Sequence, residues 1–203
     1  MPKTLELWWD FSSPFAYLGA AQAEALAART GATLVWRPML LGGLFRAIGQ
    51  VDAPVLTWSE QKRDYYFKDL ARWAEFLGVP FRFPTRFPMS SIKALRCHIA
   101  LEGDPAKQRA FREAIFRAYW SEDRDIADDA VLTGLIGDGA AGVLAKTQEP
   151  AVKQALIAST QEAQQLGIFG APTWIVRESG KEGFELFWGQ DRVQLVERAL
   201  TSD

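Results

Sequence analysis

Residues 10–18 read Asp-Phe-Ser-Ser-Pro-Phe-Ala-Tyr-Leu, and this stretch joins a predicted strand to a predicted helix. The residues before it, 3–10, alternate with apolar side chains on both faces, which is typical of a central β-strand. Ser13 suits a helix N-cap and Pro14 suits the first helical position. An alanine-rich helix with one apolar stripe is therefore expected over residues 15–29.

Downstream, the chain predicts a long helical insertion between two strand-forming parts. A strand over 32–36 completes a β-α-β unit, which implies a parallel pair. A glycine-containing loop over 40–54 leads into helical spacing without credible strands. The helices expected there cover residues 59–78, 91–101, 105–120, 128–136 and 150–166. Strands at 173–176 and 184–188 then form a predicted hairpin, and a last helix covers 191–200.

This order of elements indicates an α/β fold whose main domain is split in the sequence. Residues 1–40 and 165–203 are expected to form the two halves of that domain. Residues 41–164 are expected to form a connecting loop and a helical insertion domain.

Charge and hydropathy exclude several kinds of partner. The 203 residues include 23 basic and 25 acidic side chains, so the net charge of −2 offers no electrostatic footprint for nucleic acid or an anionic membrane. The N-terminal residues lack an apolar signal core, and no later stretch is long enough without charge to span a bilayer. A cytoplasmic location is the expectation.

The chain has a single cysteine, Cys97, and a single histidine, His98. One cysteine excludes an intramolecular disulfide and a C-x-x-C redox or metal pair. One histidine, on a predicted helix beside that cysteine, makes a poor basis for a catalytic triad or a metal site, and no metal is expected. We expect Cys97 to be a buried structural thiol and His98 to have no special role.

Two stretches, residues 10–18 and Gly-Ile-Phe-Gly-Ala-Pro-Thr at 167–173, resemble the 2-hydroxychromene-2-carboxylate isomerase family. The resemblance extends along nearly the whole chain and includes Lys62, Asp69-Leu70, Arg72-Trp73, residues 77–81 and residues 187–192. The family is close to kappa-class glutathione transferases, and both look like the periplasmic disulfide oxidases of the thioredoxin superfamily. The resemblance implies a thioredoxin-like fold, glutathione as the cofactor and a homodimer.

In thioredoxin-like redox proteins, the first cysteine of C-x-x-C begins the helix that Ser13 precedes here. Residues 13–16 contain no thiol, so disulfide exchange by this motif is excluded. A hydroxyl and a helix N-terminus stay in place, and both favour an anion. By resemblance, Ser13 holds the sulfur of glutathione as a nucleophilic thiolate and does not attack. The alternative, that Ser13 is only an N-cap, stays open.

Further glutathione contacts follow from the resemblance. Ala171, before a proline expected in the cis form, offers its main chain to the cysteinyl part of glutathione. The γ-glutamyl end is expected at a strand-to-helix junction made of Trp188, Gly189, Gln190 and Asp191. Lys62 and Asp69 match family positions near glutathione and substrate. The alternatives are a plain turn at Ala171-Pro172, helix capping by Asp191, and solvated helix charges at Lys62 and Asp69.

The implied reaction is glutathione-dependent isomerisation of an aromatic carboxylate similar to 2-hydroxychromene-2-carboxylate. Four aromatic residues are candidates either for the substrate wall or for the core: Trp58, Tyr65, Phe81 and Phe87. The family commonly has an asparagine after the second strand, whereas the loop here, residues 49–55, has none, nor does the chain. The alternatives are a kappa-type glutathione transferase or peroxidase and a non-catalytic thioredoxin-like binding module.

Overall fold

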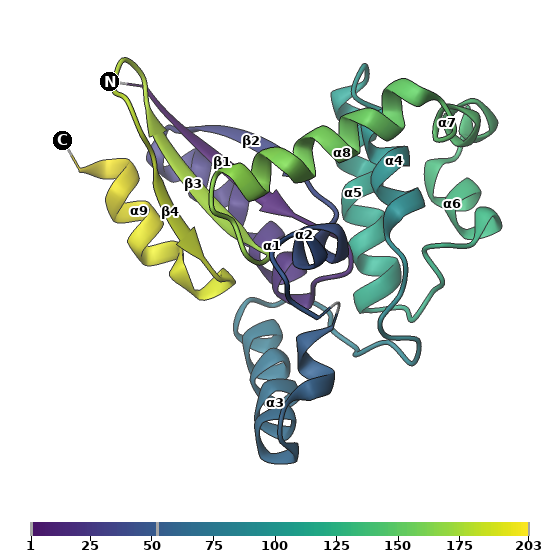
Figure 1. The fold of residues 1–203 in the computed structure, drawn as a ribbon, viewed down its shortest axis with the longest axis horizontal. Helices are drawn as coiled ribbons and strands as arrows, with labels where there is room; N and C mark the ends of the chain where they lie inside the picture. Colours follow the sequence, from purple (N-terminus) through teal and green to yellow (C-terminus); the bar gives the residue numbers. More distant parts are fainter. Residues whose placement is uncertain (1, 52, 203) are drawn as a thin grey trace.

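A computed structural model describes residues 2–51 and 53–202, which form a four-stranded sheet with helices on both sides (Figure 1). The strand order is β2-β1-β3-β4. The strands are β1 (Lys3–Trp9), β2 (Thr33–Pro38), β3 (Thr173–Glu178) and β4 (Glu185–Trp188). β1 pairs parallel with β2 and antiparallel with β3, and β3 and β4 form the predicted hairpin. The mixed α/β, thioredoxin-like fold is confirmed.

The helices α2 to α8 lie in the insertion between β2 and β3, and the last of these, α8, also covers the sheet. α1 lies behind the sheet and α8 in front of it, while α9 contacts α1 (Figure 1). The α-helices are α1 (Pro14–Thr30), α2 (Leu41–Ala47), α3 (Glu60–Phe76), α4 (Ile92–Ala100), α5 (Pro105–Trp120), α6 (Asp129–Ile136), α7 (Ala140–Lys146), α8 (Pro150–Gln165) and α9 (Val193–Thr201). Two 3₁₀ turns are η1 (Pro54–Thr57) and η2 (Gln190–Arg192). Of the described helices, none has the length and apolar character to cross a membrane.

The predicted loop over 40–54 is wrong in part, because it contains α2, and the sequence pattern also missed α7. Gly42 and Gly43 lower the helix propensity of α2, which hides it from sequence reasoning. Tertiary packing outweighs this cost, because Leu44 and Phe45 are buried and α2 contacts α8. The short α2 thereby places its N-terminal end beside the start of α1, where both line one cavity.

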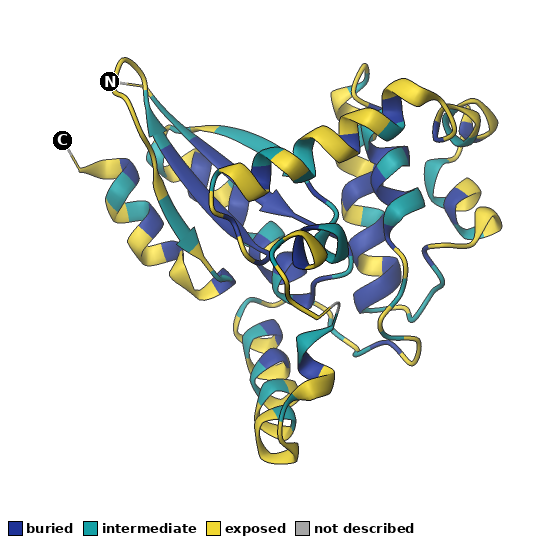
Figure 2. Ribbon diagram, in the orientation of Figure 1, coloured by how far each residue is buried: buried dark blue, intermediate teal, exposed yellow. Residues whose placement is uncertain are grey.

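One core runs from the sheet into the insertion (Figure 2). Trp9 from β1 contacts Phe11 and Phe116, with ring centroids 4.7 and 5.5 Å apart. Trp120, at the end of α5, is fully buried and donates its indole N–H to the carbonyl of Phe11 at 2.8 Å. The insertion is therefore anchored to Phe11, within the Asp10–Leu18 stretch between β1 and α1.

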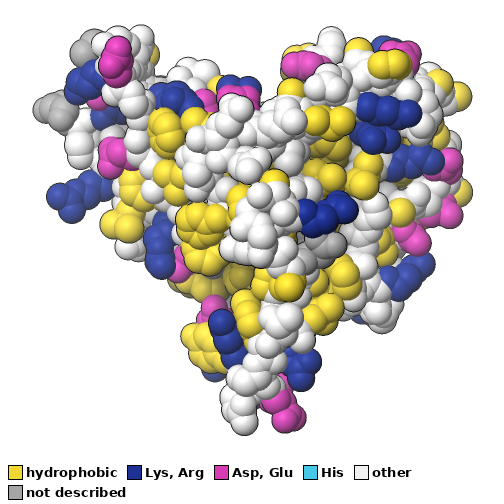
Figure 3. Space-filling view, in the orientation of Figure 1, with side chains coloured by type: hydrophobic (Ala, Val, Ile, Leu, Met, Phe, Trp, Pro, Cys, Tyr) yellow, Lys and Arg dark blue, Asp and Glu magenta, His cyan; other side chains and the backbone are white. Residues whose placement is uncertain are grey.

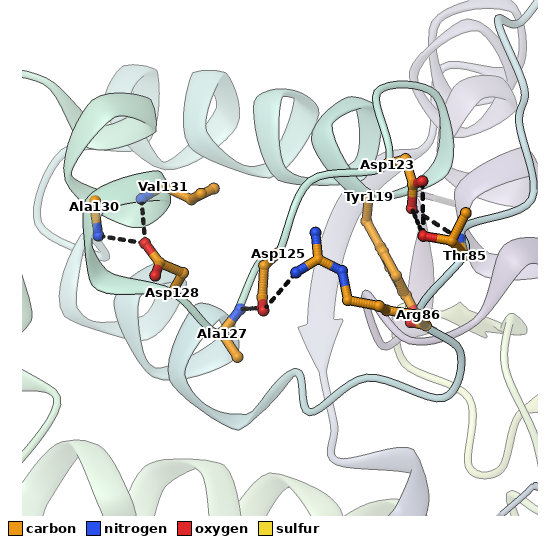
Figure 4. Close-up of polar contacts among 9 residues, drawn as sticks. All are labelled: Thr85, Arg86, Tyr119, Asp123, Asp125, Ala127, Asp128, Ala130 and Val131. Carbon is orange, nitrogen blue, oxygen red and sulfur yellow. Dashed lines mark hydrogen bonds and ion pairs between the residues drawn. The ribbon is translucent and has the colours of Figure 1, made fainter.

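The extended connector between α3 and α4, predicted at 80–88, is held by acidic residues from the loop after α5 (Figure 4). The backbone N–H of Thr85 donates to the Asp123 carboxylate at 2.8 Å, and the Arg86 guanidinium pairs with Asp125 at 3.2 Å. The Thr85 contacts lower the pKa of Asp123. This network fixes the segment that carries Phe87 into the candidate site.

Candidate functional site

Ser13 lies at the N-terminus of α1, where its side chain makes two hydrogen bonds. Its Oγ accepts from the Ala16 backbone N–H at 3.1 Å, which confirms the predicted N-cap. The hydroxyl donates to the carbonyl oxygen of Ala171 at 3.0 Å. Ser13 is 4% exposed, and its remaining surface faces a cavity. The helix end and this loop 158 residues away therefore meet at one hydroxyl.

The loop before β3 contains the predicted cis bond, between Ala171 and Pro172. Thr173 donates its hydroxyl to the carbonyl of Gly170 at 2.8 Å, which closes the turn. A Cβ atom at Gly19 of α1 would lie 2.9 Å from the Pro172 ring, so only glycine allows this approach. The close approach holds Ala171 against the start of α1.

A first cavity, of about 390 Å³, opens beside Ser13 and is here called the apolar cavity. Its walls come from residues 12–15, from α2, from Gln50, residues 53–55 and Trp58, from Tyr66 and residues 87–88, and from residues 169–171 with Trp188. Among the described residues that line it, none is Asp, Glu, Lys, Arg or His. Figure 3 shows hydrophobic side chains gathered where α3 meets the body of the molecule. Asp52 lies outside the described residues.

A second cavity, of about 220 Å³, lies on the other side of Trp188 and is here called the polar cavity. Its charged lining residues are Asp69, Asp191 and Arg192, the last two paired at 2.8 Å. The remaining lining consists of Phe15, Trp73, Ala171 and residues 188–190. This cavity has groups that can receive an ammonium and a carboxylate.

Trp188 is the wall that the two cavities share, together with Phe15 and Ala171. Its ring lies 5.0 Å from that of Phe169. A Cβ at Gly170 would lie 2.5 Å from the Trp188 indole nitrogen, so glycine is required for this ring position. Ala171, whose carbonyl accepts the hydrogen bond from Ser13, thus lies where the two cavities adjoin.

The structure brings together most of the residues predicted for the site. Ser13, Ala171 and Trp188 line the apolar cavity, and the polar cavity collects Asp69, Ala171, Trp188, Gly189, Gln190 and Asp191. Lys62 lines neither cavity, because its ammonium lies over the Trp58 ring, 4.0 Å from the centroid.

Of the four candidate aromatic residues, two line the apolar cavity and two do not. Trp58 and Phe87 line the apolar cavity. Tyr65 lines neither cavity and is not in the core, because its side chain is 61% exposed and its hydroxyl donates to Asp69 at 3.4 Å. Phe81 belongs to the core instead, since its ring stacks on Trp120.

Asp10 lines neither cavity but holds two residues that line the apolar one, and sequence reasoning did not single it out. Its fully buried carboxylate accepts from the Ser12 N–H at 3.0 Å and from the Leu41 N–H at 2.7 Å, and it also contacts Ser91. Burial raises the pKa of Asp10, although these hydrogen bonds oppose the rise. An acidic residue at the end of an apolar strand, before a predicted helix cap, was the available signal.

Cys97 and His98 lie in the core and line neither cavity. The prediction of a buried thiol at Cys97 is confirmed, and burial raises its pKa to about 12. Burial, with the nearby Arg112, lowers the pKa of His98 to about 3, so the imidazole is neutral. No cluster of His, Cys, Asp or Glu within residues 2–51 and 53–202 is arranged to hold a metal ion.

Comparison with known proteins identifies a family and relatives for this chain. The DSBA-like thioredoxin domain matches residues 4–201. The chain is 30% identical to a 2-hydroxychromene-2-carboxylate isomerase of Sphingobium xenophagum, over 98% of this chain and 99% of that protein. It is 29% identical to human glutathione S-transferase kappa 1, over 98% of this chain and 92% of that protein.

Solved structures agree with this relationship. The structure of a 2-hydroxychromene-2-carboxylate isomerase superposes with a TM-score of 0.80 at 27% identity, covering 97% of this chain and 94% of the other. The cytosolic disulfide reductase DsbM from Pseudomonas aeruginosa with GSH shares the fold, with a TM-score of 0.65 at 21% identity over 98% and 100% of the two chains. The chain therefore belongs to the DSBA-like thioredoxin family, among the relatives of 2-hydroxychromene-2-carboxylate isomerase and kappa-class glutathione transferase.

Proposed function

We propose that the protein is a glutathione-dependent enzyme in which Ser13 holds the glutathione thiolate for reversible addition to a conjugated aromatic substrate, the reaction of an isomerase. One observation carries the proposal: a polar and an apolar cavity meet at the N-terminus of α1, sharing Phe15, Ala171 and Trp188. Glutathione fits the polar side and a conjugated hydrocarbon framework fits the apolar side.

The Ser13 hydroxyl reaches the sulfur by turning away from the Ala171 carbonyl. This turn gives up one neutral hydrogen bond, worth about 1 kcal/mol net, and replaces it with a charge-assisted one of roughly twice the strength. The Ala16 N–H continues to donate to the Ser13 oxygen and polarises the O–H. The positive end of the α1 dipole adds to the same effect, so the thiolate form of glutathione is favoured.

The ends of glutathione are assigned by charge. In the proposal, the Asp191 carboxylate receives the γ-glutamyl ammonium, with Asp69 on the facing wall. Arg192 and the backbone of residues 189–190 receive the γ-glutamyl carboxylate. The main chain of Ala171 lies beside the cysteinyl part. Lys62 serves the glycyl carboxylate once it leaves the Trp58 ring.

The reaction needs no net change in atoms. The sulfur lone pair forms a C–S bond to the β-carbon of a conjugated carbonyl, and the π pair moves to the carbonyl oxygen as an enolate. The former double bond is now single and turns. The enolate then re-forms the double bond in the other geometry and expels the thiolate, so glutathione is regenerated.

A kappa-type transferase is the second candidate, and the uncharged lining of the apolar cavity favours it. The sequence resemblance implies a carboxylate-bearing substrate, which this lining does not pair. In a transferase the same thiolate forms a lasting bond to an electrophile. The two candidates share the glutathione site and differ only in whether the sulfur leaves again.

The test is spectrophotometric, with purified protein, glutathione and 2-hydroxychromene-2-carboxylate. The isomerase predicts conversion that depends on glutathione and falls in Ser13→Ala. Turnover of a chloronitrobenzene or an organic peroxide, without this isomerisation, would support the transferase or peroxidase instead. Calorimetry that detects no glutathione binding would contradict both and leave a binding module.

Cytoplasmic location and homodimerisation also enter as proposals, from the resemblance. A glutathione-dependent enzyme works where reduced glutathione is plentiful, as in the cytosol. Light scattering of the purified protein measures the subunit number, and a monomer would contradict the dimer.

A further inference from the structure

A third cavity, of about 300 Å³, lies between α2, α4 and α8 and is here called the basic groove. α8 contacts both of the other helices, and Figure 3 shows Lys and Arg side chains beside hydrophobic ones over α4 and α8. The basic groove shares no lining residue with either cavity at the start of α1. It is therefore a candidate binding site separate from the proposed active site.

The charged residues that line the basic groove, within the described part of the chain, are two cations. Arg96 of α4 and Lys153 of α8 are both half-buried. Neither forms an ion pair within residues 2–51 and 53–202. The Nε–H of Arg96 is fully buried and finds no acceptor among those residues. Two half-buried cations that line one cavity favour an anion in it, since a charge taken out of water is stabilised by an opposite charge.

Other buried or half-buried cations of the chain do have carboxylate partners. The guanidinium of Arg177 lies 2.9 Å from the carboxylate of Glu6, and that of Arg112 lies 3.4 Å from the carboxylate of Glu24. For the two cations of the basic groove, water or a bound anion supplies the acceptors instead. This difference sets the basic groove apart from the ion pairs that only hold the fold together.

Much of the remaining lining of the basic groove is hydrocarbon. The apolar side chains are Leu40, Ile92, Leu156 and Ile157, the last of which is 47% exposed. An inorganic anion gains little from such a surface, and an uncharged hydrocarbon gains little from the cations. A carboxylate joined to a hydrocarbon chain matches both parts, because its chain buries apolar area while its oxygen atoms accept charge-assisted hydrogen bonds.

Hydrogen bonds between α8 and the segment before α2 fix one wall of the basic groove. The Leu40 N–H donates to the Thr160 hydroxyl oxygen at 3.0 Å, and that hydroxyl donates to the Leu156 carbonyl at 2.8 Å. One turn earlier, the Ser159 hydroxyl donates to the Pro38 carbonyl at 2.6 Å. A ligand that enters a preformed groove loses little of its binding free energy to ordering the protein.

We propose that the basic groove binds a small organic carboxylate, with its oxygen atoms paired to Arg96 and Lys153 and its hydrocarbon chain against Leu156 and Ile157. A guanidinium holds a carboxylate through two parallel N–H bonds, and an ammonium on a flexible stem adds a third. The site involves neither Ser13 nor glutathione, so it stands or falls independently of the proposed function.

The first experiment is an NMR titration of the full chain with hexanoate as the probe. Hexanamide tests the charge, because it has the same chain without one, and acetate tests the chain, because it has the same charge on one methyl group. We expect hexanoate to bind about tenfold or more tightly than either, and to shift backbone amides of α4 and α8. Equal affinity for hexanamide, equal affinity for acetate, or no binding of hexanoate would overturn the inference.

Three glutamine variants locate the charge that is recognised. Arg96→Gln should weaken hexanoate about tenfold, and Lys153→Gln, whose side chain is more flexible, about threefold. Lys146→Gln removes a positive charge from an exposed position of α7 outside the lining, and its affinity should stay within about twofold of the wild type. An equal loss in all three variants would indicate an effect of net charge alone and overturn the inference.

Arg96→Lys guards against a variant that simply misfolds. It keeps the positive charge in the basic groove, so it should regain most of the affinity that Arg96→Gln loses. Urea unfolding of each variant checks that the chain is folded at the titration temperature. If hexanoate bound with unchanged affinity to Arg96→Gln and Lys153→Gln and shifted amides around Ser13 instead, the basic groove would not be its site.

A second copy of this chain is the competing occupant of the basic groove. Light scattering of Ile157→Asp tests it, because a charge at this exposed apolar position opposes burial in an interface. We expect the subunit number to equal that of the wild type. A dimer that Ile157→Asp converts to a monomer, together with no binding of hexanoate to the wild type, would assign the groove to an interface and overturn the inference.

Discussion

The polar and apolar cavities at the start of α1 draw their walls from different parts of the chain. The polar cavity is built mainly on the sheet domain, through residues 188–192 and Ala171. The apolar cavity takes most of its wall from the insertion, through α2, Gln50, residues 53–55, Trp58 and residues 87–88. In the proposed function, glutathione recognition is thus tied to the geometry of a sheet, and substrate choice to the loops and helices of the insertion.

The Asp10 carboxylate joins the end of β1, in the sheet domain, to α2, in the insertion, so its removal affects both parts of the molecule. Asp10→Ala leaves the N–H groups of Ser12 and Leu41 without their acceptor. Two partly buried donors without partners cost about 2 to 3 kcal/mol together. We expect the free energy of unfolding to fall by this amount, measured by urea denaturation.

The control is Asp138→Ala, at an exposed position before α7. It should change stability by less than about 0.5 kcal/mol. If Asp10→Ala were as stable as this control, the carboxylate would not be what joins α2 to the end of β1.

Ser13→Ala removes the hydroxyl that, in the proposed reaction, holds the glutathione sulfur beside Ala171, where the two cavities adjoin. Loss of a charge-assisted hydrogen bond to the sulfur is worth about 2 kcal/mol, which is roughly a 30-fold fall in kcat/KM. The pKa of bound glutathione should rise by about one unit or more. The measurement is a titration of the thiolate absorbance alongside steady-state kinetics.

Ser12→Ala is the matched control, because Ser12 lines the apolar cavity but makes no cap contact with Ala16. It should keep the thiolate pKa of the wild-type complex. An unchanged thiolate pKa in Ser13→Ala would leave Ser13 as an N-cap alone.

Local patterns predicted the sheet side of the molecule well. The alternation of β1 and the Ser13 cap depend on neighbouring residues, the cis Ala171–Pro172 bond is expected from the family resemblance, and the structure has each of them. Much of the polar cavity follows from these elements, since its lining residues 188–192 lie at and directly after the end of β4, while Asp69 and Trp73 come from α3.

The insertion side depends on tertiary placement, which local patterns do not contain. α2 forms despite Gly42 and Gly43 because Leu44 and Phe45 find a buried surface. Tyr65 and Tyr66 are adjacent in sequence but about 100° apart around α3, so a single step decides which one reaches the cavity. The helical stripe already contained Tyr66, but nothing local showed what that stripe faces.

The pH dependence of stability tests the buried carboxylate separately from its hydrogen bonds. Because the folded pKa of Asp10 is raised, the folded chain binds more protons than the unfolded chain between about pH 4 and that raised pKa. The free energy of unfolding therefore falls as pH rises through this window, with a slope of at most about 1.4 kcal/mol per pH unit from this group.

Asp10→Asn lacks the titration while keeping one acceptor oxygen. We expect the stability difference between wild type and Asp10→Asn to change across the window in the direction that disfavours wild type at higher pH. Urea unfolding at a series of pH values measures this difference. Parallel curves for the two proteins would mean that Asp10 does not titrate with a raised pKa.

Asp191→Asn and Phe45→Leu test the two cavities separately, and their expected effects on KM are the smallest of the predicted effects. Asp191 is half-exposed, so its pairing with the γ-glutamyl ammonium is worth about 1 kcal/mol, and the KM for glutathione should rise roughly fivefold in Asp191→Asn. Phe45→Leu reshapes only the apolar cavity and should raise the KM for the electrophile instead. Steady-state kinetics with each substrate varied in turn measures both constants.

Asp64→Asn is the matched control for charge, since Asp64 lies on α3 and lines neither cavity at the start of α1. Its glutathione KM should equal that of the wild type. If Asp191→Asn and Phe45→Leu each changed both constants by the same factor, the two cavities would act as one site. A change confined to one constant in each variant would instead mean that the sheet domain binds glutathione while the insertion selects the electrophile.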